Sequence, residues 1–265
     1  MMNRLLFTLV TLAAPLAAQW IHYPTAGLPR LANGKPNLSA PTPRTKDGKP
    51  DLSGFWEANR EGGTGVSFTG AQLPPLFKNI GAQLKDGLPY SPWGRDLLNS
   101  RLADNSKDSP DAKCLPLGIL WLHSHLSPRK VLQSPGLVVI LYERFTQFRQ
   151  IFTDGRPLPV DPEPSFFGYS SGKWDGDTLV VQTIGFRDDQ WADSDGSPLT
   201  GSGKVTERIR RPNYGSLEIE ITVDDPKAYT APWTVKLSQH LQVDTDLLEF
   251  VCVDEEKNRP HVVGK

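Results

Sequence analysis

From residue 137 towards the C-terminus, apolar and polar residues alternate with a period of two. In the segment 217–223, "LEIEITV", leucine, isoleucine and valine occupy every second position, with glutamate and threonine between them. Such alternation is typical of an antiparallel strand with one buried and one exposed face. Because no helical window separates the segments, this part of the chain is predicted to fold as consecutive strands.

Turn signals divide this half of the chain into eight predicted strands. They are 137–143, 146–153, 165–174, 177–184, 203–211, 216–223, 232–241 and 247–253. Pairs such as Asp154-Gly155 and Asp175-Gly176 are typical of tight connections between antiparallel neighbours. The predicted fold is mainly β, an antiparallel meander that closes into a barrel, with a β-sandwich as the alternative.

The stretch 167–181, "FGYSSGKWDGDTLVV", combines glycine, serine and aspartate in a way that also suits a phosphate-binding loop. Such a loop needs a helix after it, so that the backbone amides converge on the anion. A β-branched segment follows instead, which indicates a hairpin turn at Asp175-Gly176.

The first 18 residues have the layout of a secretory signal peptide. Arg4 precedes an apolar run from Leu5 to Ala18, and this run is shorter than the roughly 20 residues of a membrane-spanning helix. Cleavage after Ala18 would give a secreted or periplasmic protein. Nothing later in the sequence is apolar enough to span a bilayer, so no membrane span is expected.

Residues 19–53 are rich in proline and glycine and are predicted to form an extended arm. Two similar units occur there, "NGKPNLS" and "DGKPDLS", each too short to bury a core by itself. Residues 54–265 are then predicted to be one barrel domain, with an insertion of loops and short helices at about 60–135. In this insertion, Ser91 and Pro92 mark the start of a short amphipathic helix.

The chain has two cysteines, Cys114 and Cys252. An even, small number of cysteines in an exported protein predicts one disulfide, and the alternative is a pair of buried free thiols. No Cys-x-x-Cys or His-x-x-x-His motif is present, so neither a metal nor another cofactor is expected. His123 and His125, two positions apart, are the remaining metal-ligand candidates.

Acidic and basic residues are almost balanced, with 29 Lys and Arg against 30 Asp and Glu and a net charge of −1 at pH 7. A protein that binds nucleic acid or an anionic membrane surface would show a basic patch or a strongly positive charge. The balance predicts neither a nucleic-acid partner nor an anionic membrane surface. The partner expected on other grounds, given below, is a small molecule or a saccharide. The charge balance predicts no particular oligomeric state.

Several motifs resemble those of known proteins. "SGFWEA" (53–58) is similar to the Gly-x-Trp opening of lipocalin-like barrels, in which Trp56 would close the barrel base from the first strand. "DGKPDLSGFW", "CLPLG", "RQIFTDGRPLPVDPEPSFFGYSSGKWDGDTLVVQTIGF", "TERIRRPNYGSLEIEITVDDPKAYTAPWTV" and "LLEFVC" together resemble a family of secreted, mostly uncharacterised proteins of soil bacteria. The resemblance covers nearly all of the mature chain and implies a secreted lipocalin-like barrel, but no particular reaction.

Glu207 is the first candidate catalytic residue. In "TERIRR" it shares a strand face with Ile209, so a Glu207 directed into a barrel would suit a general base. Asp188 and Asp189 lie on a predicted loop near Trp191, and one acid kept protonated by burial would suit glycoside chemistry. The structural alternative is an Asp-rich turn and a Glu–Arg ion pair.

Ligand contacts are predicted for six side chains on strands, on a loop and at a pocket mouth. They are Arg149, Arg208, Trp191, Tyr142, Trp233 and His125. The guanidinium group of Arg149 or Arg208 would orient a carboxylate or a hydroxyl group of the ligand.

These features favour two functions. The first is a secreted barrel whose lumen holds a small amphipathic molecule, either as a carrier or for acid–base chemistry of the lyase, hydratase or isomerase type. The second is a carbohydrate-binding or glycoside-processing protein with Trp121, Trp191 and Trp233 on an exposed cleft. A structural envelope domain is a third reading, expected if apolar side chains fill the barrel. The sequence leaves open whether the protein is an enzyme.

Overall fold

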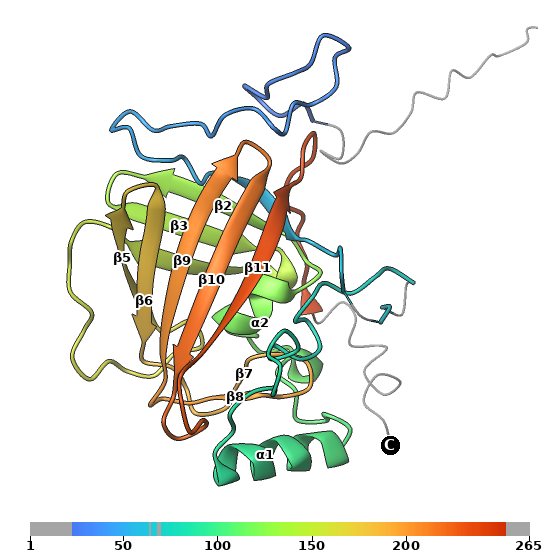
Figure 1. Cartoon of the computed structure of the whole chain (residues 1–265), viewed down its shortest axis with the longest axis vertical. Coiled ribbons are helices and arrows are strands. Elements are labelled where there is room, and N and C mark those ends of the chain that lie inside the picture. Colours follow the sequence, from blue (N-terminus) through green and yellow to red (C-terminus); the bar gives the residue numbers. More distant parts are fainter. Residues whose placement is uncertain (1–22, 64, 68–69, 253–265) are drawn as a thin grey trace, which may run out of the picture.

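The computed structural model describes residues 23–63, 65–67 and 70–252, and the predicted signal peptide (1–18) lies outside them. Within the described residues, nine strands form a closed barrel (Figure 1). These strands are β1 (Gly54–Ala58), β2 (Arg129–Ser134), β3 (Leu137–Tyr142), β4 (Gln147–Phe152), β5 (Tyr169–Asp175), β6 (Thr178–Ile184), β9 (Lys204–Asn213), β10 (Ser216–Asp224) and β11 (Trp233–Leu241). The predicted barrel is confirmed, and the β-sandwich alternative is wrong.

Around the barrel the strands follow the order β1-β11-β10-β9-β6-β5-β4-β3-β2, and β2 pairs with β1 to close the ring. Neighbours are antiparallel except β4 and β5, which run parallel where Ile151 pairs with Ser170 and Phe152 with Ser171. The barrel is therefore mixed and not purely antiparallel as predicted. Parallel neighbours need a long return connection, and residues 153–168 provide it on the outside of the barrel (Figure 1).

Inward side chains at every second strand position fill the barrel. On β10, Leu217, Ile219 and Ile221 are buried, whereas Glu218 is exposed. On β9, Glu207 is buried on the inward face, as its register predicts. The period-two pattern of the sequence thus identifies the buried face of these strands.

The arm lies across one end of the barrel (Figure 1). Its two similar units fold alike, because Arg30 and Arg44 each donate to the carbonyl of the glycine four residues later, over 3.0 and 2.9 Å. Each arginine also pairs with a carboxylate of the barrel region, Arg30 with Asp244 and Arg44 with Asp177. The repeated motif therefore fastens the arm at two places.

Helix α2 (Ile119–Ser124) and a separate sheet of β7 (Gln190–Trp191) and β8 (Pro198–Leu199) lie at the opposite end. Every residue of α2 is buried, as its apolar sequence "ILWL" requires. Helix α1 (Pro92–Ala103) lies outside this end and begins as predicted, with the Ser91 hydroxyl accepting from the Gly94 amide. Two short 3-10 turns, η1 (Asp111–Lys113) and η2 (Arg144–Thr146), complete the elements.

Three segments differ from the prediction. The short strands β7 and β8 lie in a stretch for which no strand was predicted. Strand β2 lies in the region that was expected to hold only loops and short helices. Residues 247–252 form no strand, although their sequence is apolar, and Val253 lies outside the described residues. Strand β1 already joins β2 to β11, so the barrel closes without this segment.

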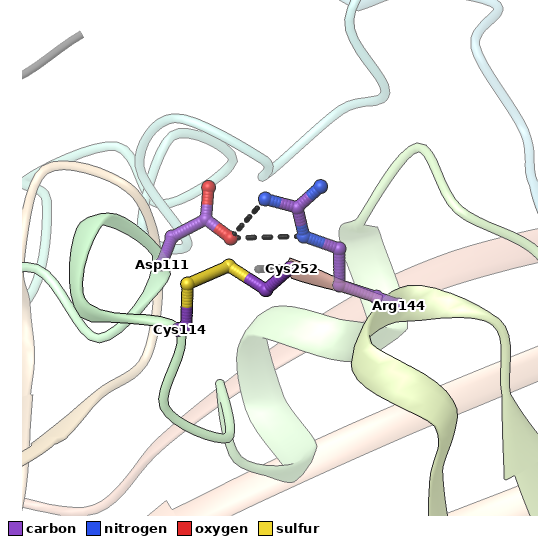
Figure 2. Close-up of a disulfide and its surroundings, with 4 residues drawn as sticks. All are labelled: Asp111, Cys114, Arg144 and Cys252. Carbon is purple, nitrogen blue, oxygen red and sulfur yellow. Dashed lines mark hydrogen bonds and ion pairs between the residues drawn. A yellow bond between two sulfur atoms is a disulfide. The ribbon is translucent and has the colours of Figure 1, made fainter. Parts of the chain in front are cut away.

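The segment 245–252, called the C-terminal strap below, lies along the outside of the barrel. The disulfide between Cys114 and Cys252 holds it, with the two Cα atoms 5.6 Å apart (Figure 2). Beside the disulfide, the Arg144 guanidinium donates to Asp111 Oδ1 over 2.6 Å and joins η2 to η1. The predicted disulfide is confirmed, and the alternative of two free thiols is wrong.

Strand β1 is short, and half of β11 therefore has an open edge. The pairing of β1 with β11 ends where Ala58 lies opposite Gln239, and one further bond joins the Asn59 amide to the Ser238 carbonyl over 2.9 Å. Among the described residues, no strand pairs with residues 233–237 on this side of β11.

Candidate functional site

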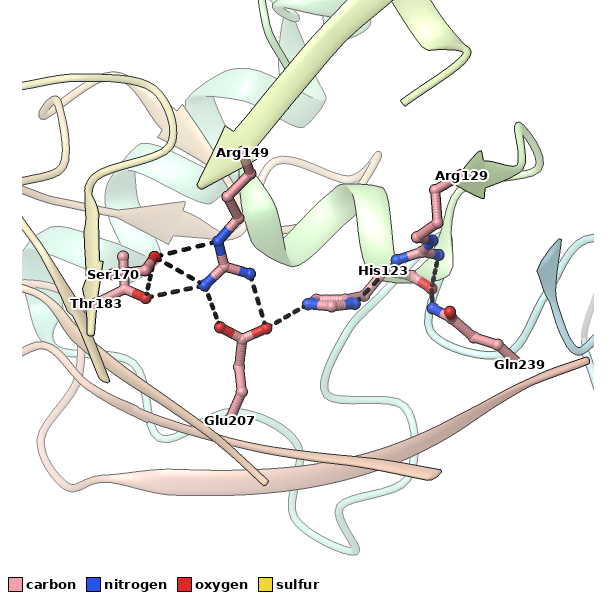
Figure 3. A network of polar contacts seen from close by, with 7 residues as sticks. All are labelled: His123, Arg129, Arg149, Ser170, Thr183, Glu207 and Gln239. Atoms are coloured by element: carbon pink, nitrogen blue, oxygen red, sulfur yellow. Dashed lines mark hydrogen bonds and ion pairs between the residues drawn. The ribbon is translucent and has the colours of Figure 1, made fainter. Parts of the chain in front are cut away.

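A buried polar network crosses the lumen of the barrel (Figure 3). Its members are Arg129 from β2, Arg149 from β4, Ser170 from β5, Thr183 from β6, Glu207 from β9, Gln239 from β11 and His123 from α2. All of these residues are buried. Inward positions of separate strands thus bring polar groups to one level of the lumen.

Arg149 and Glu207 form a bidentate ion pair at the centre of this network. Arg149 Nη1 donates to Glu207 Oε1 over 2.9 Å, and Nη2 donates to Oε2. The same guanidinium donates to the hydroxyls of Ser170 and Thr183, each over 3.0 Å. A buried ion pair is tolerated when its remaining donors find partners in this way.

His123 connects the ion pair to Arg129. Arg129 Nη1 lies 3.0 Å from His123 Nδ1, and because an arginine can only donate, Nδ1 accepts and the ring proton sits on Nε2. His123 Nε2 then donates to Glu207 Oε1 over 2.6 Å. Arg129 and Gln239 also donate to the backbone carbonyl of His123 and hold the residue in place.

The charge states of the network follow from burial and from these contacts. Burial alone would raise the pKa of Glu207, but the Arg149 cation and the hydrogen bonds from His123 and Arg149 outweigh it and lower this pKa. Burial lowers the pKa of His123, more than Glu207 raises it. Burial also lowers the pKa of Arg129, to about 10. At neutral pH the network holds a Glu207 anion, a neutral His123 and two arginine cations.

This geometry favours a structural role for Glu207. Its side chain has an exposure of 0%, and its carboxylate accepts three hydrogen bonds, two from Arg149 and one from His123. Both ring nitrogens of His123 are engaged, so neither offers a lone pair to a substrate proton. The contacts match the Glu–Arg ion pair that the sequence left as the structural alternative.

Next to the network lies an enclosed lumen cavity of about 20 Å³. Nine aliphatic side chains line it together with His123, Arg129 and Gln239. The cavity has room for about one water molecule. A small amphipathic molecule, which the sequence analysis expects in the lumen, does not fit into a cavity of this size.

A much larger cavity, called the β11 groove below, opens beside the unpaired half of β11. It measures about 510 Å³. Its residues are Ala58, Asn59, Glu61, Pro75, Gln83, His123, Ser124, Thr178, Arg208, Arg210, Glu218, Ile219, Glu220, Lys236, Leu237 and Ser238. The groove therefore reaches from the outer face of the barrel to the buried C-terminal end of α2.

Charged side chains in two cross-strand rows form the outer wall of the β11 groove. In one row Arg208, Glu220 and Lys236 lie opposite one another, and Lys236 pairs with Glu220 over 3.1 Å. In the next row Arg210 lies opposite Glu218 at 3.5 Å. These pairs are largely exposed, so water and salt screen them and a ligand can displace them at low cost. Arg208, a predicted ligand contact, belongs to this wall and not to the lumen.

Asp188 and Asp189 lie apart from Glu207, on the exposed surface. Asp188 accepts from the Gly201 amide over 2.9 Å, and this hydrogen bond lowers its pKa. Asp189 pairs with Arg187 over 2.9 Å, which lowers its pKa as well. Neither is therefore an acid kept protonated by burial, which the predicted glycoside chemistry requires.

The three tryptophans proposed for a carbohydrate cleft are buried. Trp191 stacks on Trp121 with ring centres 6.4 Å apart, and Arg101 covers it at 4.7 Å. Trp233 packs edge-on against Tyr229. Because their faces are occupied, the predicted platform of surface tryptophans is wrong. Asp189 and Trp191 do line a common pocket of about 280 Å³, which is separate from the β11 groove.

The two histidines point to different surroundings. His123 enters the polar network, whereas His125 packs between Phe77 and Trp121, and burial lowers its pKa to about 3. Among residues 23–63, 65–67 and 70–252, no group of His, Cys, Asp or Glu side chains is arranged to hold a metal ion. Tyr142, another predicted ligand contact, is buried and stacks on Phe167.

Comparison with protein-family models and with curated proteins gives no match for this chain. Within the described part of the chain, neither helix has the length and the apolar character needed to cross a lipid bilayer.

Proposed function

We propose that this protein is a secreted binding protein that holds an amphipathic ligand in the β11 groove. The observation that carries the proposal is the groove itself, an open cavity of about 510 Å³. This volume falls within the range of about 300–1,000 Å³ that is typical of small-molecule sites.

The two sides of the groove differ in chemistry. Charged side chains of β9, β10 and β11, such as Arg208 and Lys236, form the outer wall, whereas Ala58, Ile219 and Leu237 contribute apolar surface. A ligand with a polar and an apolar side would satisfy both walls. The disulfide between Cys114 and Cys252 supports an oxidising compartment such as the periplasm or the medium.

Binding is favoured over acid–base catalysis by the state of the buried network. The groove reaches His123, but both nitrogens of this residue are occupied inside the protein. A general base needs a free lone pair within reach of the substrate proton. The buried network therefore supports the barrel, and the groove holds the ligand.

A fluorescence titration with 8-anilinonaphthalene-1-sulfonate, an amphipathic aromatic anion, tests the groove. Ser238→Trp places a bulky side chain in the groove and should weaken binding at least tenfold. Ser134→Trp, at an exposed position of β2 outside the groove, is the matched control and should bind like the wild type. Equal binding by both folded variants, or no saturable binding by the wild type, would contradict the proposal.

A further inference from the structure

We infer that the ligand of the β11 groove is an extended peptide, which pairs with the open edge of β11 as a continuation of β1. The inference rests on the proposed binding function and names the chemical class of the ligand. Its basis is the coincidence of two features, a groove and an unpaired strand edge, at the same residues of β11.

The hydrogen-bonding direction of β11 supports this placement. The Ser238 carbonyl accepts from the Asn59 amide over 2.9 Å, so Ser238 presents its backbone groups to the β1 side. Alternate residues of an antiparallel strand face the same neighbour. Lys236 and Thr234 therefore present their backbone groups to the side on which β1 has ended.

A side chain already occupies one of these positions. The Lys236 amide donates to the side-chain oxygen of Gln83 over 3.3 Å, towards the long end of the hydrogen-bond range. Gln83 is exposed and also lines the groove. A peptide carbonyl would accept a hydrogen bond from the Lys236 amide in place of Gln83. This bond would continue the backbone pairing that the Asn59 amide makes with the Ser238 carbonyl.

The lining of the groove matches the alternation of a strand. A peptide in register with β1 would direct one set of side chains outward, beside Lys236 and Ser238. It would direct the other set inward, towards Ala58 and Leu237. Residues 233–237 would pair with about 16 Å of extended chain. A segment of about five residues with alternating polar and apolar side chains therefore fits.

The charge of the edge indicates which polar residues fit best. Lys236 has a side-chain exposure of 74% and is the charged residue among the outward positions 234, 236 and 238 of β11. An acidic residue opposite Lys236 would form a favourable cross-strand pair. A lysine on an exposed edge also discourages pairing between two copies of the same strand.

The probe is a pentapeptide of alternating glutamate and valine, acetylated and amidated at its ends, measured by titration calorimetry. Antiparallel pairing with Lys236 directs the glutamate amides to β11 and the valine amides away from it. Methylation of the glutamate nitrogens should therefore weaken binding about tenfold or more, because it removes bonds to β11. Methylation of the valine nitrogens is the matched control and should change binding less than threefold.

A protein variant gives an independent readout. Lys236→Pro removes an amide that faces the open edge and not β10, so it should abolish peptide binding while the barrel folds. Lys236→Ala keeps the amide and should weaken binding only a few-fold. In the wild type, hydrogen exchange of the Lys236 amide should slow when the peptide is added.

The outcomes separate this inference from the proposed function. If the wild type binds anilinonaphthalene sulfonate in the groove but not the peptide, or binds both methylated peptides equally, the inference is wrong and the binding function stands. If it binds neither probe, both are wrong. If the wild type is a dimer that Lys236→Pro converts into a monomer, the edge belongs to a second copy and the inference is wrong.

Discussion

His123 Nε2 and Glu207 Oε1 lie 2.6 Å apart in the interior of the barrel, between two arginine cations. One residue comes from a helix at the end of the barrel and the other from the middle of a strand. Their contact ties α2 to the barrel wall. The network therefore fixes the position of α2, and with it the inner end of the β11 groove.

Removal of the Glu207 charge should destabilise the protein strongly. Glu207→Gln leaves the buried Arg149 without its counter-ion, and loss of one partner of a buried pair costs about 3–5 kcal/mol. Urea unfolding followed by circular dichroism measures the loss. Glu218→Gln, at an exposed ion pair, is the control and should cost less than about 1 kcal/mol. Similar losses for the two variants would show that the network does not support the fold.

The same residue predicts the behaviour of the protein in acid. The pKa of Glu207 is lower in the folded protein than its ordinary value near 4.5, so its contribution to stability is complete above that pH. The contribution should be lost as the pH falls below about 4.5, because the folded state resists protonation more than the unfolded state. Unfolding free energies between pH 2.5 and 5 should show this loss in the wild type and a much smaller one in Glu207→Gln.

Asp193 should act in the opposite direction. It is buried and accepts hydrogen bonds from the Ile80, Gly196 and Ser197 amides, but burial outweighs them and raises its pKa to about 6. Its raised pKa favours the folded state at low pH, and this advantage disappears as the pH rises from about 4 to 6. The loss amounts to roughly 3 kcal/mol. Asp193→Asn should remove this pH dependence, and a parallel pH profile of variant and wild type would contradict the assignment.

The disulfide should contribute substantially to stability. It closes a loop with a sequence separation of 138 residues, for which chain entropy gives about 4–5 kcal/mol. The double variant Cys114→Ser, Cys252→Ser should have a free energy of unfolding lower by this amount and should therefore unfold at a lower urea concentration. Addition of dithiothreitol should lower the unfolding midpoint of the wild type but not that of the variant. No difference in the unfolding midpoint would mean that strain in the native state offsets the entropic gain.

A glycine in helix α1 gives a test of packing. Glycine to alanine in a helix usually stabilises a protein by about 1 kcal/mol. A Cβ atom on Gly94, however, would lie 2.3 Å from the backbone carbonyl oxygen of Ala228. Gly94→Ala should therefore lower the melting temperature, whereas Asn99→Ala, on the exposed face of α1, should leave it unchanged or raise it slightly.

The sequence predicts the repetitive part of this fold well. Alternation of apolar and polar residues identifies β4, β9, β10 and β11, and β3 and β6 stand out as apolar segments between turn signals. It fails for the C-terminal strap, which lies outside the closed ring, where Phe250 contacts Phe145 but Leu248 and Val251 are exposed. It also fails for β2, whose segment "RKVLQS" carries too few apolar residues to stand out.

Some residues of the polar network were likewise predicted from the sequence, and others were missed. The inward direction of Glu207 follows from its register, and the alternation allowed for an inward Arg149. Ser170, Thr183 and Gln239 also sit at inward positions, but small or neutral polar residues give no signal of a charge nearby. His123 could not be paired with Glu207 from sequence, because their contact depends on how α2 enters the barrel.

The parallel step between β4 and β5 determines how this barrel can change. In a closed ring, neighbours that all alternate in direction must be even in number, and nine strands satisfy the ring because one pair does not alternate. If one strand were lost or gained, the ring could close only if the parallel pair were also lost or if a second parallel pair were formed. The proline-rich connection 153–168 is thus a condition of the strand count, and shortening it would force a different architecture and not merely a smaller loop.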